Sequence, residues 1–114
     1  MRRFEDLDVW KRSSRLCVNV YKELACCKDF GFKDQITRCS LSVPSNIAEG
    51  FERDTDKDGN KFLYYAKGSC GELRTQIYIG IEIGYIKKET GLQWKNEAEQ
   101  LSKMLSALIK SRSS

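Results

Sequence analysis

Histidine is absent from this 114-residue chain, and proline occurs once. Without histidine, the chain lacks the most common general base near neutral pH and half of the ligands in common zinc sites. Glycine-rich phosphate loops and G-x-S-x-G nucleophile turns are also missing. No apolar run approaches the roughly 20 residues that span a bilayer, and the start of the chain has no signal-peptide pattern. We therefore expect a cytoplasmic protein that is not an enzyme, with no catalytic residue, metal, cofactor or membrane segment.

The cysteines favour structural thiols. There are five, an odd number, and no C-x-x-C spacing occurs among Cys17, Cys26, Cys27, Cys39 and Cys70. Free cysteine packs as a small hydrophobe in a reducing compartment. A cysteine or carboxylate enzyme is the weakest hypothesis, and it would require a deep pocket formed by Glu49, Glu72 and Cys70.

Apolar residues recur at alternating spacings of three and four, the period of an amphipathic helix, and no segment alternates with the period of a strand. The pattern predicts helices at about 6–27, 33–52, 57–86 and 91–111. Short connections between such helices predict an all-α, antiparallel up-down four-helix bundle, as a single domain over residues 1–114. Asp6 and Thr90 are expected to cap the first and last helices, and Gly31 to be a turn residue.

Each predicted helix has an apolar stripe that should face the core. In the first two helices, the stripes are Leu7, Trp10, Ser14, Cys17, Tyr21 and Leu24, and then Ile36, Ser40, Val43, Ile47 and Gly50. In the last helix the stripe is Trp94, Ala98, Leu101, Leu105 and Leu108. The third helix has two adjacent stripes, Ala66, Ser69, Leu73, Gln76, Gly80 and Ile83 beside Leu63, Cys70, Ile77 and Gly84.

Pro44 falls inside the second predicted helix. It removes one backbone donor and crowds the carbonyl of Ser40. Because the apolar pattern keeps its phase on both sides of the proline, we predict one continuous helix with a kink. The alternative is a new helix that begins at Pro44, with Val43 as its cap.

The segment QITRCSLSVPSNIAEGFER, residues 35–53, resembles the signature of the bacterial 23S ribosomal RNA intervening-sequence proteins. FEDLDVWKRS near the start, AKGSCGEL at 66–73 and GYI at 84–86 are similar to further patterns of that family. The matched motif residues are Pro44, Ser45, Asn46, Glu49, Gly50, Gly68, Ser69 and Glu72. Cys39, Ser40 and Gly71 depart from the pattern without weakening the fold prediction.

The resemblance implies a second helix bent at the proline and a ring-shaped homopentamer. Family members are encoded within insertions in 23S ribosomal RNA genes and elsewhere in bacterial genomes. A similar bundle is the accessory protein of diversity-generating retroelements. The resemblance to this accessory protein implies binding to RNA or DNA and a protein partner such as a reverse transcriptase.

The signature itself has two interpretations. On a helix it forms a polar stripe of Arg38, Ser42, Ser45 or Asn46, Glu49 and Arg53. In the functional interpretation, Arg38, Asn46 and Arg53 grip a phosphate backbone or a partner helix. In the structural interpretation, which we favour, Glu49 pairs with Arg53 and Ser42 or Ser45 satisfies groups freed by the proline. Asn46 would then bond to the third helix, at Gln76 or Glu72.

The formal net charge is +4, a weak signal for nucleic acid. Both chain ends of an up-down bundle lie together, so basic residues there could form one surface, and a ring would multiply it. Such phosphate contacts would be independent of sequence and sensitive to salt. The nucleic-acid-binding candidates are Arg2, Arg3, Lys11, Arg12, Arg15, Arg38, Arg53, Lys110 and Arg112. The alternative function is a protein-interaction scaffold without affinity for nucleic acid.

The third predicted helix has features of a subunit contact. Gly80-x-x-x-Gly84 would let another helix approach closely, within the bundle or between subunits. Tyr64, Tyr78 and Tyr85 favour an oligomer contact if they are exposed, because tyrosine is enriched in interface cores. If they are buried, ordinary core packing explains them.

Overall fold

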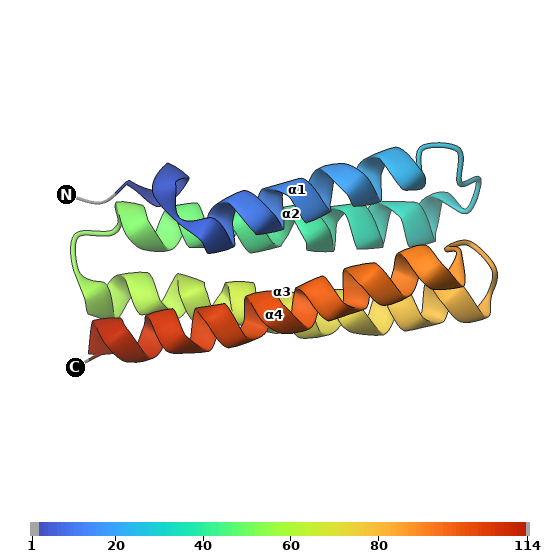
Figure 1. Cartoon of the computed structure of the whole chain (residues 1–114). Helices are drawn as coiled ribbons and strands as arrows, with labels where there is room; N and C mark the ends of the chain where they lie inside the picture. Colours follow the sequence, from blue (N-terminus) through green and yellow to red (C-terminus); the bar gives the residue numbers. More distant parts are fainter. Residues whose placement is uncertain (1–2, 114) are drawn as a thin grey trace.

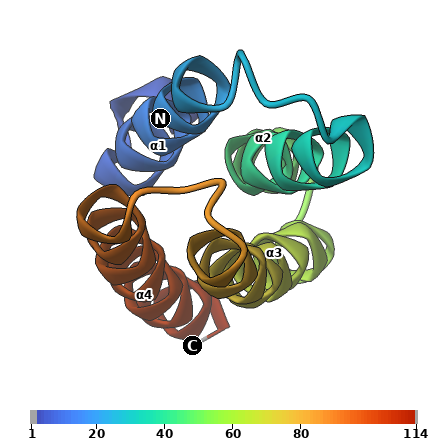
Figure 2. The same cartoon turned by 90° about the vertical axis from the view of Figure 1, so that its right-hand side faces the viewer.

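The computed structural model describes residues 3–113, which form four α-helices and one 3-10 turn. The elements are η1 (Phe4–Asp6), α1 (Asp8–Glu23), α2 (Phe30–Glu52), α3 (Asp56–Glu82) and α4 (Lys88–Ser113). Successive helices run antiparallel in a rod of 44 × 20 × 20 Å, with both chain ends at the same end of the rod (Figure 1). Viewed along the axis, α1 lies diagonally opposite α3 (Figure 2). The predicted all-α up-down bundle is confirmed.

The ends of the helices differ from the predicted ones, and local hydrogen bonds explain two of the differences. Helix α2 begins at Phe30 because the Asp29 carboxylate accepts from the Phe32 amide at 3.1 Å, so Gly31 lies within the first turn of the helix. Helix α1 begins after Leu7, whose side chain makes no capping bond, so the predicted cap at Asp6 is wrong. It ends at Glu23, and α4 begins at Lys88, before the expected cap Thr90.

Helix α3 ends at Glu82 in a glycine-terminated turn. Gly84 adopts a φ of +84°, a left-handed conformation that costs glycine little. The amide of Tyr85 donates to the Gly80 carbonyl at 2.9 Å and that of Gly84 to the Ile81 carbonyl at 3.1 Å, the two bonds of a Schellman motif. Ile86 then folds back over Gly80, where an added Cβ would lie 2.5 Å from its Cδ1. An added Cβ at Gly80 would also lie 2.9 Å from Cζ of Phe32 on α2, so Gly80 allows a close approach within the bundle, whereas Gly84 ends the helix.

The core confirms most of the predicted stripes. The α2 stripe is buried throughout, and Trp94, Ala98, Leu101 and Leu105 are buried on α4. On α3 the buried side chains come from both predicted stripes: Leu63, Ala66, Cys70, Leu73 and Ile77. The outer members of those stripes, Ile83 and Gly84, are exposed.

The α1 stripe was predicted in part: Leu7, Cys17 and Leu24 are buried, and Trp10 and Ser14 are half-buried. Tyr21 is 44% exposed, whereas Val9, Leu16 and Val20 are buried. Two overlapping three-and-four patterns run along this segment and share Cys17. A helix that packs between two neighbours buries a wide arc, so spacing alone cannot choose between such patterns.

Helix α2 is one continuous helix (Figure 1), and Pro44 is buried inside it. Val43 is buried inside the same helix, so the alternative of a new helix capped by Val43 is wrong. The predicted kink at Pro44 is not confirmed.

The backbones of α2 and α3 touch where the two helices join. A Cβ on Gly50 would lie 2.7 Å from the Gly59 carbonyl oxygen, and a Cβ on Gly59 would lie 2.2 Å from that of Gly50. Both contacts are with backbone atoms, which cannot rotate away. Only glycine at these two positions allows this approach, so Gly50 of the signature is a packing residue.

We predict that Gly50→Ala lowers the free energy of unfolding by about 1–3 kcal/mol, because the new methyl group forces the two helices apart. Chemical denaturation measures the change. Gly31→Ala is the control, since its Cβ would make an ordinary contact of 3.6 Å with Asp29. Equal stability of the two variants would contradict the assignment of Gly50 to helix packing.

Candidate nucleic-acid interface

The two signature segments face each other across the contact between α2 and α3. The Ser42 hydroxyl donates to the Ser69 hydroxyl at 2.7 Å, and the Cys39 thiol donates to the Ser69 carbonyl at 3.3 Å. Burial raises the pKa of the Cys39 thiol, and the nearby Glu72 carboxylate raises it further. These groups satisfy one another inside the chain, which supports the structural interpretation of the signature.

The remaining signature residues also make local contacts. The Glu49–Arg53 ion pair is present at 3.6 Å, as predicted. The Asn46 amide donates at 2.8 Å to the carbonyl of Ser42 in its own helix, rather than to the expected Gln76 or Glu72 of α3. Ser45 and Gly68 are exposed. A Cβ added at Gly68 would meet no atom of the described residues within 4 Å.

Most of the predicted nucleic-acid-binding arginines already hold a carboxylate. The pairs are Arg3–Glu5, Arg12–Glu97, Arg38–Asp34, Arg53–Glu49 and Arg112–Asp56. Two of these guanidinium groups also lie over aromatic rings at 4.4 Å, Arg53 over Phe62 and Arg112 over Phe51. A phosphate would have to compete with these partners. Lys11, Arg15 and Lys110 form no ion pair within residues 3–113, and Arg2 lies outside the described residues.

The end of the rod that holds both termini is balanced in charge. A hollow of about 700 Å³ there is lined by Arg3, Arg53 and Arg112, but also by Glu5, Glu52, Asp54 and Asp56. Glu52 ends α2, Asp54 lies in the loop that follows, and Asp56 begins α3. Among the described residues, the lining of this hollow therefore carries both signs of charge rather than basic groups alone.

An excess of positive charge lies instead in the groove between α3 and α4. A hollow of about 410 Å³ is lined by Lys67, Arg74, Glu99, Ser102, Lys103 and Ser106. Glu99 is its one carboxylate and is shared by Arg74 at 3.7 Å and Lys95 at 3.4 Å. Lys67 and Lys103 have no ion-pair partner in the described chain. Together the four cations and two serine hydroxyls could hold a phosphate backbone.

Sequence reasoning missed this groove because it grouped basic residues by their position along the chain. A signal was present in the helical spacing. Lys95, Glu99 and Lys103 recur every four residues on α4, and Lys67 and Arg74 are seven residues apart on α3. These spacings place each set on one helix face. Only the pairing of α3 with α4 brings the two sets together.

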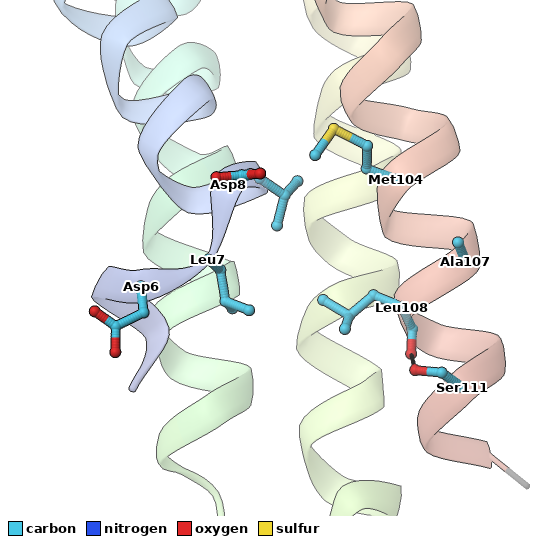
Figure 3. A pocket seen from close by; sticks show the side chains of 8 residues that line it. Asp6, Leu7, Asp8, Met104, Ala107, Leu108 and Ser111 are labelled. Atoms are coloured by element: carbon cyan, nitrogen blue, oxygen red, sulfur yellow. Dashed lines mark hydrogen bonds between the residues drawn. The ribbon is translucent and has the colours of Figure 1, made fainter. Parts of the chain in front are cut away.

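A different hollow opens between the start of α1 and the end of α4 (Figure 3). Leu7, Met104 and Leu108 project into it, while Asp6 and Asp8 lie at its edge (Figure 3). Its volume is about 450 Å³, and no lysine or arginine lines it in the described chain. Its lining would therefore repel a phosphate rather than bind it.

The buried thiols have the properties of packing groups. Burial raises the pKa of Cys70 to about 12 and also raises that of Cys17. Both side chains therefore stay protonated near neutral pH and are poor nucleophiles. Within residues 3–113, no group of three or more Cys, Asp or Glu side chains is placed to hold a metal ion. None of the described helices is long and apolar enough to cross a membrane.

Comparison with known proteins identifies the family of this chain. The model of the 23S rRNA-intervening sequence proteins matches residues 5–107. The chain belongs to this family. A crystal structure of a protein of unknown function from the S23 ribosomal protein family of Bacteroides thetaiotaomicron superposes with a TM-score of 0.83 and 26% identity, over 90% of this chain and 98% of that one. No curated protein matches the chain. The resemblance of the signature to the 23S rRNA-intervening sequence family is thus confirmed.

One ion pair of this intervening-sequence protein joins α1 to α4. The Arg12 Nε atom donates to Glu97 at 2.9 Å. This hydrogen bond lowers the pKa of Glu97 from its ordinary 4.5, and partial burial opposes the shift. Because the folded pKa lies below the unfolded one, the pair stabilises the fold above about pH 4.5, and the stabilisation is lost as the pH falls through the folded pKa.

We predict that Glu97→Gln lowers the free energy of unfolding at pH 7 by about 0.5–1 kcal/mol, a modest amount because both side chains are partly exposed. The difference from the wild type should shrink as the pH falls below about 4.5 and vanish below the folded pKa of Glu97. Denaturation curves across pH measure it, with the exposed Glu23→Gln as control. A destabilisation that stays constant down to pH 3 would show that charge pairing is not the cause.

Proposed function

We propose that this protein is a non-enzymatic, homo-oligomeric bundle that binds RNA or DNA through phosphate contacts, without sequence preference. The observation that carries the nucleic-acid part is the groove between α3 and α4, where Lys67 and Lys103 have no acidic partner among the described residues. Unpaired lysines can neutralise phosphates without first giving up an internal ion pair. Two serines and the flexible stems of the lysines offer no base-reading geometry, so binding would be electrostatic.

The proposed homo-oligomer is supported by the exposed tyrosines of α3. Tyr64 and Tyr78 are 59% and 48% exposed, which is the condition that favours an oligomer contact. Tyr85 instead makes contacts within the chain, because its hydroxyl donates to Asp29 at 2.9 Å and its ring packs edge-on against Phe32. The expected subunit number is the pentamer that the family resemblance implies. A ring would repeat the weak groove of one subunit several times and raise the total affinity.

A scaffold without affinity for nucleic acid is the second candidate. It is favoured by the ion pairs that occupy five of the predicted arginines. Fluorescence anisotropy of the full chain with labelled single-stranded and double-stranded RNA, from 25 to 300 mM salt, separates the two. Binding at low salt that weakens steeply with added salt supports the proposal. Absence of binding at the lowest salt would exclude nucleic-acid binding and support the scaffold function.

We predict that Lys67→Gln with Lys103→Gln weakens binding to duplexes of any sequence roughly tenfold. The slope of log affinity against log salt should fall by about 1.8, since each lost phosphate contact removes about 0.9. Lys28→Gln with Lys87→Gln is the matched control, because it removes the same charge from exposed positions in the loops at the other end. If the two double variants bind equally weakly, net charge and not the groove drives binding.

A further inference from the structure

The outward side of α3 exposes large apolar side chains that the bundle does not cover. Five of them are between 48% and 59% exposed: Tyr64, Tyr65, Tyr78, Ile79 and Ile83. We call these residues the α3 tyrosine face. They form two groups about 20 Å apart along the helix, Tyr64 with Tyr65 and Tyr78 with Ile79 and Ile83. A single exposed apolar residue is ordinary, but several on one side of a helix are typical of an interaction surface.

Two positions on the same side of α3 are glycine, although no contact within the described chain requires glycine there. A Cβ added at Gly68 or Gly71 would meet nothing within 4 Å among the described residues. Glycine is a poorer helix former than alanine, so these positions weaken α3 without helping the bundle to pack. Gly80 in the same helix differs, because its Cβ would lie 2.5 Å from Ile86. Glycine does help when another backbone approaches from outside.

The diagonally opposite helix, α1, has a hollow on its outer side. On the outer side of α1, a shallow hollow of about 340 Å³ is lined by Trp10, Lys11, Ser14, Arg15 and Val18. We call these residues the α1 hollow. It combines apolar walls with the cations Lys11 and Arg15, which form no ion pair within the described chain. A cation beside an apolar wall suits a tyrosine ring, through packing and a cation–π contact.

The charges beside the two surfaces also match. Glu72 and Glu82 are exposed near the α3 tyrosine face and form no ion pair within residues 3–113. Ten residues of helix separate them by about 15 Å. Lys11 and Lys22 on the outer side of α1 are about 16 Å apart by the same measure. Two carboxylates on one surface can therefore meet two ammonium groups on the other.

From these observations, we propose that the α3 tyrosine face of one copy docks on the α1 hollow of a second copy. The inference rests on the proposed homo-oligomer and names its contact. Helices α1 and α3 make no contact with each other within the described chain and lie on opposite corners of the bundle (Figure 2). Their outer sides therefore point away from each other, so each subunit has two different contact surfaces. Such a head-to-tail contact continues from copy to copy and closes into a ring when the rotation allows.

The test is sedimentation velocity of the full-length wild type and two variants over a range of concentrations. Gly68→Ala with Gly71→Ala adds methyl groups to the α3 surface, and Lys11→Glu with Lys22→Glu reverses the charge of the α1 surface. We expect each change to raise the dissociation constant of self-association at least tenfold. The glycine variant should melt no lower than the wild type when both are dissociated, because alanine favours the helix. Gly31→Ala and Lys28→Glu with Lys87→Glu are the controls.

Mixing the two dissociated variants gives the decisive result. One retains an intact α3 tyrosine face and the other an intact α1 hollow, so the mixture should form a one-to-one dimer and nothing larger. If only the glycine variant dissociates, α3 pairs with itself and the head-to-tail contact is wrong. A wild type that assembles while both variants assemble equally well overturns this inference alone. A monomeric wild type overturns the proposed homo-oligomer, and this contact with it.

Discussion

The close approach of α2 and α3 at Gly50 and Gly59 is the constraint on which the rest of the bundle depends. With no side chain between them, the two backbones touch at these residues. That contact brings Ser42 beside Ser69 and leaves Cys39 in reach of the Ser69 carbonyl. The last turn of α4 closes over the same point, where Arg112 bonds to Asp56 at 2.9 Å and stacks on Phe51. Within the signature of the 23S rRNA-intervening sequence family, Gly50 and Ser69 therefore join the two helices, whereas Asn46 and Glu49 form contacts within α2.

Arginine and lysine have different roles in this fold. A guanidinium group matches a carboxylate or an aromatic ring in a defined geometry, so most of the arginines are used to fasten one turn or helix to another. An ammonium group at the end of a flexible stem gains less from such pairs, and Lys67 and Lys103 remain free beside the groove. Helix α3 has a different role on each of three sides. It packs on α2 on one side, lines the cationic groove with α4 on the second, and exposes tyrosines on the third.

Much of this fold could be predicted from the sequence because its signals are local. The apolar spacing predicted four helices, and the i,i+4 pair Glu49–Arg53 formed as expected. The failures arise where a residue has two possible environments. Trp10 and Tyr21 fit one helical stripe as well as Val9 and Val20 fit another, and only the neighbouring helices decide between them. The groove cations come from two helices, and Lys67 on α3 is far from Lys103 on α4 in sequence, so no local pattern brings them together. The carboxylates that occupy Arg12 and Arg112 are likewise distant in sequence.

Native-state hydrogen exchange tests the central claim, that the contact of α2 with α3 holds the bundle together. The contact of α1 with α4 is the least extensive between neighbouring helices, so the N-terminal helix should open first. Amides of Ile47 and Gly50 on α2, and of Leu63 and Ala66 on α3, should exchange only through global unfolding, with the largest protection in the chain. Amides of Leu16 and Val20 on α1 should exchange through a smaller opening. Protection in α1 that equals or exceeds that around Gly50 would contradict the account.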